Sequence, residues 1–145
     1  GIVRAAPSNG FQDARVGVSA ILYPQPFGLQ GEWNWGRGPA LSLDQTRITV
    51  ASLNGGYLQA MYRHQSPYGI LMPFVRWQYF DGAMKFERNA PRTSVTETEL
   101  GLEWQIRPEI ELTTLYSISD RTNVLVAPYE QLSGDTLRMQ LQWNY

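Results

Sequence analysis

Polar and apolar residues alternate without exception over the last ten residues of this chain, 136–145. In an extended strand, period-two alternation places the apolar residues on one face and the polar residues on the other. The apolar set is Leu137, Met139, Leu141, Trp143 and Tyr145. A strand of an outer-membrane barrel turns such a face to lipid and its polar face to the lumen, with aromatic residues near the interface. The pattern therefore predicts an all-β fold, an antiparallel transmembrane β-barrel.

The composition excludes several other classes of protein. No stretch approaches the roughly 18 apolar residues of a membrane-spanning helix. A membrane protein with this sequence must therefore be a barrel, because only helices and closed barrels satisfy their backbone groups in lipid. The chain has no cysteine, which rules out disulfides and thiolate metal sites. Its formal net charge of -1 provides no basic field, so we expect no nucleic-acid partner.

Six further segments alternate in the same way, and most are near the length that a tilted spanning strand needs. They are residues 15–23, 27–35, 47–63, 70–80, 97–106 and 109–119. Residues 1–6 are a candidate eighth strand, because single-chain barrels have an even number of strands. The run Asn54-Gly55-Gly56 interrupts the third segment but keeps its parity, which predicts a bend or bulge.

The connections between these segments alternate between two lengths. Short connections are expected at residues 24–26, 64–69 and 107–108, and long loops at 37–46, 81–96 and 120–135. Outer-membrane barrels have short turns on the periplasmic side and long loops outside, so the C-terminus is expected on the periplasmic side. The 81–96 loop is long enough to fold into the lumen, although a solvated outer loop is the default expectation.

Five runs carry a resemblance to a known family. They read YPQPFGLQGEW (23–33), PFVRWQYFD (73–81), ETELGLEW (97–104), LTTLYSISDR (112–121) and LRMQLQWNY (137–145). In this order they resemble the C-terminal half of the phosphate-selective porin O/P family, from about Arg15 onward. The resemblance implies a homotrimer of about sixteen-stranded barrels in outer-membrane lipid, with arginines lining a path for small anionic or polar solutes such as phosphate.

The number of strands bears on whether such a channel is open. The interior of an eight-stranded barrel is filled by side chains, whereas barrels of about sixteen strands hold an aqueous channel. We therefore expect residues 1–145 to be a single β-barrel region, formed by the C-terminal strands of a longer porin in the bacterial outer membrane. The alternative is a small closed eight-stranded barrel with a structural or surface-interaction role.

The candidate functional residues are the charged side chains that the alternation places on the lumen-facing side of the strands. The predicted channel-lining set is Arg15, Arg47, Arg63, Arg76, Arg138, Glu99 and Glu103. Guanidinium groups stay charged and match phosphate or carboxylate oxygens, so a series of them could pass an anion along. The same face carries acids, among them Glu32, Glu97 and Glu111, so the arginines could instead pair across strands. Arg15, Arg63 and Arg76 are preferred because they fall inside alternating segments.

Two other kinds of chemistry find little support in the sequence. The five tryptophans share the apolar parity with Tyr62, Tyr79, Tyr116 and Tyr145, which favours interface girdles and lipid contact over a stacking platform for sugars or bases. The single histidine, His64, falls in a predicted turn with no cysteine or second histidine. Neither a metal site nor a Ser-His-Asp arrangement is expected, and we predict no cofactor and no enzyme activity.

Overall fold

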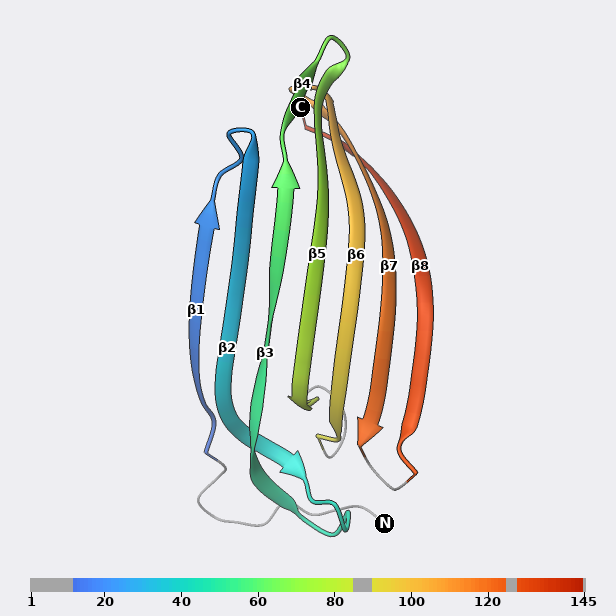
Figure 1. Cartoon of the computed structure of the whole chain (residues 1–145). Helices are drawn as coiled ribbons and strands as arrows, with labels where there is room; N and C mark the ends of the chain where they lie inside the picture. The colour runs from blue at the N-terminus through green and yellow to red at the C-terminus, as the bar shows by residue number, and fades with distance from the viewer. Residues whose placement is uncertain (1–11, 85–89, 125–127, 145) are drawn as a thin grey trace.

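A computed structural model describes residues 12–84, 90–124 and 128–144, which form one antiparallel β-sheet (Figure 1). The strands are β1 (Ala14–Leu22), β2 (Phe27–Leu41), β3 (Ile48–Tyr62), β4 (His64–Ser66), β5 (Gly69–Ala83), β6 (Arg92–Arg107), β7 (Ile110–Val124) and β8 (Glu130–Trp143). The long strands pair in chain order, and the short β4 pairs with β5. The predicted all-β antiparallel fold is confirmed. No helix of the described segments is long and apolar enough to cross a membrane.

The register places residues of equal parity side by side and so gives the sheet two chemically different faces. On the apolar face, Leu100 lies between Val75 and Tyr116. All three side chains are exposed although they are large and hydrophobic. Farther along this face the rings of Trp33, Trp77 and Tyr79 stack, with centroids 6.1–6.2 Å apart. The predicted placement of these aromatics on the apolar face is confirmed.

The apolar face ends at a common level, and the strands continue beyond it. On β5 the outward residue after Tyr79 is Asp81, and on β7 the outward residue after Ile118 is Asp120. The register sets Asp81 opposite Ser94 and Asp120 opposite Ser133, so β6 and β8 are polar at this level too. Each of these strands is therefore longer than its apolar band.

This extension overturns the predicted long loops. The connections between strands span only residues 42–47, 84–91 and 125–129, and the rest of the predicted loops is paired strand. The predicted 81–96 loop is shorter than expected, because Asp81 belongs to β5 and Arg92 to β6, where the two side chains form an ion pair. Residues 85–89, within that predicted loop, lie outside the described residues.

Three smaller predictions have different outcomes. The Asn54-Gly55-Gly56 run contains no bulge, because it pairs residue by residue with both β2 and β5. The register shifts instead between Gln105 and Arg107 on β6, and part of the predicted 64–69 turn is the strand β4. The candidate strand at residues 1–6 and the terminal Tyr145 lie outside the described residues.

The two ends of the sheet carry different connections between strands. The short β1–β2 turn and the C-terminal end of β8 lie at one end, and the β2–β3 and β7–β8 connections lie at the other (Figure 1). In the described part of the chain, β1 and β8 are the two edges and do not pair with each other, so the sheet is not closed. Every described residue of both edge strands is exposed.

The most buried side chains gather where the β2–β3 hairpin reaches the β5–β6 connection. The lower part of β2 turns out of line with its upper part (Figure 1), and the Leu41 N–H donates a hydrogen bond to the Ala90 carbonyl at 3.0 Å. The buried residues near this junction are Ala40, Leu53, Met84, Ala90 and Thr93. The hairpin therefore supplies much of the tightly packed core of the described chain.

Candidate channel wall

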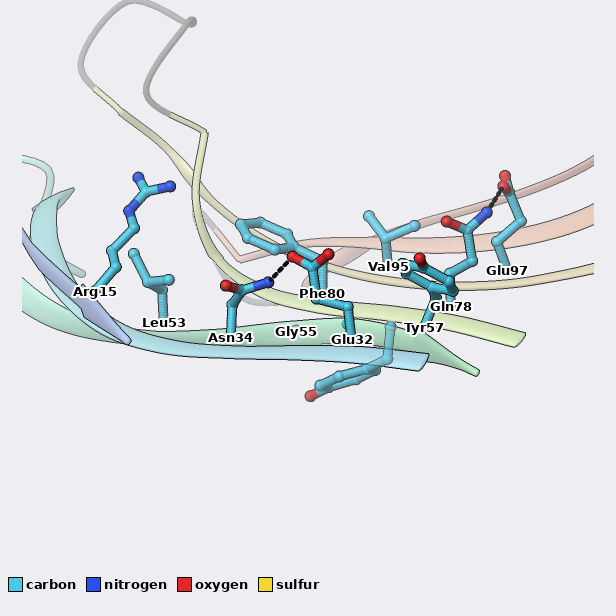
Figure 2. Close-up of a pocket in the computed structure, with 12 residues that line it drawn as sticks. Arg15, Glu32, Asn34, Leu53, Gly55, Tyr57, Gln78, Phe80, Val95 and Glu97 are labelled. Atoms are coloured by element: carbon cyan, nitrogen blue, oxygen red, sulfur yellow. Dashed lines mark hydrogen bonds between the residues drawn. The ribbon is translucent and has the colours of Figure 1, made fainter. Parts of the chain in front are cut away.

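A row of four hydrogen-bonding side chains crosses the polar face of four strands. The register sets Glu32 of β2 opposite Tyr57 of β3, Tyr57 opposite Gln78 of β5, and Gln78 opposite Glu97 of β6. The Gln78 amide donates to the Glu97 carboxylate at 2.9 Å, and Asn34 donates to Glu32 at 2.7 Å. Both interactions are drawn in Figure 2.

These residues line a cavity of about 590 Å³ on the polar face. Figure 2 shows the labelled side chains rising from the same side of the sheet, with Arg15 at one end and Glu97 at the other. Leu53, Phe80 and Val95 add an apolar section to the lining. The cavity is therefore amphipathic, with carboxylates and amides beside a hydrocarbon surface.

A second charged row lies one step nearer to the short turns. Arg76 of β5 is flanked in the register by Gln59 of β3 and Glu99 of β6. Its Nε donates to Gln59 Oε1 at 2.7 Å and its Nη1 donates to Glu99 Oε2 at 3.0 Å. Gln59 and Glu99 are both buried, and the guanidinium also lies over the rings of Tyr57 and Phe74. Arg76 is thus held by neighbours on the wall itself.

The other predicted arginines lie far apart. Arg15 is on β1, lines the cavity and is 3.5 Å from the Asp13 carboxylate. Arg138 is on the polar face of the edge strand β8, opposite Leu115. Among the residues predicted to line the channel, the structure joins only Arg76 and Glu99 by an ion pair within the described segments.

The remaining predicted residues occupy three different settings. Arg47 lies in the β2–β3 connection, where its carbonyl accepts a hydrogen bond from the Ser42 N–H at 2.9 Å. Arg63 lies between β3 and β4, so the prediction that it falls inside a strand was wrong. Glu103 is on β6 opposite Thr113, on the polar face.

Reasoning from charge missed the uncharged members of the wall. Tyr57, Gln78, Asn34 and Phe80 line the cavity, yet none was singled out from the sequence. Their parity in the alternating segments is the signal that could have identified them. Within the described segments no group of three His, Cys, Asp or Glu side chains is placed to hold a metal ion.

An antiparallel sheet with one exposed aliphatic and aromatic face and one polar face is the wall of a transmembrane β-barrel. The short turns lie at the same end of the sheet as the C-terminal end of β8, which agrees with the outer-membrane type of barrel. The chain belongs to the phosphate-selective porin O and P family, whose family model matches residues 3–145. The family resemblance carried by the five sequence runs is thereby confirmed. No curated protein and no solved structure gave a significant match.

Proposed function

We propose that these strands form part of the wall of a water-filled outer-membrane channel for passive diffusion of small polar solutes. The observation that carries the proposal is the separation of the two faces across the long strands. Exposed residues such as Val75 and Leu100 suit lipid, whereas Gln59, Arg76 and Glu99 on the opposite face suit a hydrated lumen. Membership of a porin family supports the same function.

The open sheet favours a wide barrel over a small closed one. Edge strands leave backbone N–H and C=O groups unpaired, and such groups are costly in lipid. We therefore propose that β1 and β8 pair with further strands in the membrane. Nothing in the described residues favours the alternative, a closed eight-stranded barrel with a structural role, because β1 and β8 do not approach pairing.

The solute class and assembly are also proposals. The family description names phosphate, and Arg15 and Arg138 are polar-face guanidiniums that could contact small anionic solutes. Arg76 contributes less to an anion path, because Glu99 offsets its charge at 3.0 Å. Association as a homotrimer in outer-membrane lipid follows from the family resemblance.

The test is conductance of the complete native protein after purification from outer membranes and insertion into planar lipid bilayers. We expect stepwise ohmic conductance in KCl. Arg138→Glu should shift the reversal potential in a KCl gradient toward cation preference, because it reverses one charge on the lumen face. Gel migration before and after heating would reveal a heat-labile trimer. Protein that inserts but carries no current would refute the channel.

A further inference from the structure

We propose that the cavity spanning β2, β3, β5 and β6 is a binding subsite for an uncharged, hydroxyl-rich solute of monosaccharide size. The inference rests on the proposed function, since the solute would reach the cavity through the lumen. The cavity volume of about 590 Å³ lies within the range of small-molecule binding pockets, roughly 300–1,000 Å³.

The polar lining retains free hydrogen-bonding capacity of both kinds. Glu32 and Glu97 each accept one amide hydrogen bond, and a carboxylate has about four acceptor positions. Gln78 and Asn34 each use one N–H of two in these bonds. Acceptors and donors side by side match hydroxyl groups, which donate and accept at once.

Tyr57 adds a donor at the centre of the row. Its phenolic oxygen accepts a hydrogen bond from Gln30 at 2.7 Å, which leaves its O–H to donate. The register places Tyr57 directly between Glu32 and Gln78. A bound hydroxyl can therefore contact two neighbouring strands simultaneously.

The apolar section of the lining suits the C–H surface of such a solute. Phe80 and Val95 are direct cross-strand neighbours, one step from the polar row, and Leu53 lies beside them in the lining. Gly55 is opposite Phe80, and the Phe80 ring lies close over it, with Cδ2 3.2 Å from where a Cβ of residue 55 would stand. Ligand pockets commonly combine such hydrocarbon surface with a few convergent polar groups.

The charges of the cavity disfavour an anion as its occupant. Glu32 and Glu97 make no ion pair with any described residue. Arg15 is the cationic side chain among the described lining residues, and its guanidinium is 3.5 Å from the Asp13 carboxylate. Two uncompensated carboxylates repel phosphate, whereas they accept hydrogen bonds from neutral hydroxyl groups.

The experiment uses the complete native protein and D-glucose as the probe. Glucose should cause a concentration-dependent, partial block of bilayer current. Tyr57→Phe removes one neutral hydrogen bond and should weaken the block by about two- to tenfold. Glu97→Gln replaces a charged acceptor and should weaken it by about tenfold or more. Gln140→Ala, on the polar face of β8 outside the cavity, is the matched control and should leave the block unchanged.

Calorimetric titration of glucose into the folded protein in detergent separates this inference from the channel function. A protein that binds glucose through Tyr57 and Glu97 yet conducts no ions would support the subsite and refute the channel. A conducting protein with no glucose block, or with a block that neither substitution alters, would overturn the subsite. A block by inorganic phosphate that Glu97→Gln strengthens would overturn it as well, because relief of repulsion would make the occupant an anion.

Discussion

Arg76 and Glu99 face each other across β5 and β6, and the guanidinium donates to the carboxylate at 3.0 Å. Glu99 is only 6% exposed, so the Arg76 guanidinium replaces part of the hydration that its carboxylate loses. The pair therefore acts as a neutral unit of the polar face. We expect the pair to contribute to the stability of the folded protein while adding no net charge to the polar face.

Removing one member of this pair should destabilise the protein. We expect Arg76→Leu to lower the free energy of unfolding by about 2 kcal/mol, because it leaves a buried carboxylate without its ion-pair partner. The double substitution Arg76→Leu with Glu99→Leu should cost less than the sum of the two single changes. Urea unfolding of the protein in lipid vesicles measures all three. Additive effects would show that the two residues do not interact in the membrane.

The same pair gives a prediction about ion selectivity. Arg76→Gln combined with Glu99→Gln keeps the net charge of the wall, so the reversal potential in a KCl gradient should stay near that of the unmodified channel. Arg76→Gln alone should shift it toward cations. A large shift in the double variant would mean that solutes sense the two charges separately.

The two faces should respond differently to an added charge. Leu100→Arg places a guanidinium at the middle of the apolar face and should cost about 2–4 kcal/mol of stability in a bilayer. Ser117→Arg, on the polar face of the neighbouring strand, should cost far less. Folding into vesicles, followed by denaturant titration, compares the two. Equal costs would contradict lipid contact at Leu100.

Packing of the β2–β3 hairpin can be tested at Leu53. This side chain is 8% exposed, and we expect Leu53→Ala to destabilise the protein by about 2–3 kcal/mol through the cavity it leaves. Leu43, in the connection of the same hairpin, is 70% exposed and provides the control. Leu43→Ala should change the denaturant midpoint little. Comparable effects at both positions would show that the hairpin does not pack as described.

Asp44 makes the β2–β3 connection sensitive to acid. The hydroxyl of Ser42 donates to its carboxylate at 2.5 Å, and this bond, with those from Thr46, lowers the pKa of Asp44 from 3.8 to about 2. Because the folded pKa is lowered, the stabilisation is present above about pH 4 and is lost as the pH falls toward 2. Pepsin should therefore cleave this connection faster as the pH falls through that window.

Asp44→Asn provides the control for this titration. Asparagine cannot ionise, so the increase in cleavage beyond the change in pepsin's own activity should disappear. Ser42→Ala should move the titration back toward pH 4, because it removes the main donor. The carboxyl carbon shift of Asp44 in NMR spectra reads the same pKa directly, and a value near 4 in the folded protein would contradict the assignment.

The fold class could be predicted from the sequence because alternation is a local property. Each segment shows its two faces within its own residues, so the seven long strands and their order needed no tertiary information. The missed strand ends have a physical cause. Beyond Tyr79 and Ile118 the outward residues are Asp81 and Asp120, so the apolar outward residues that mark a membrane strand end there.

The candidate site was less predictable than the fold. Parity placed Arg76 and Glu99 on the polar face, but their pairing depends on the register between β5 and β6. Arg63 shared that parity and yet lies past the end of β3. Tyr57 and Gln78 are neighbours although they come from two different strands, β3 and β5. The alternation within one strand does not show which residue of the next strand will lie opposite.

The sequence by itself thus determined the class of fold, the lipid-facing aromatics and the family, because these follow from side-chain alternation and from ordered runs of residues. Tertiary structure alone decided which polar groups meet. Cross-strand register sets Arg76 against Glu99 and brings the side chains from Glu32 to Glu97 into one row, and the packing of the β2–β3 hairpin joins Leu41 to Ala90. Register is set by the hydrogen bonds between paired strands, and shifting it by a single residue would turn every side chain of a strand to the other face.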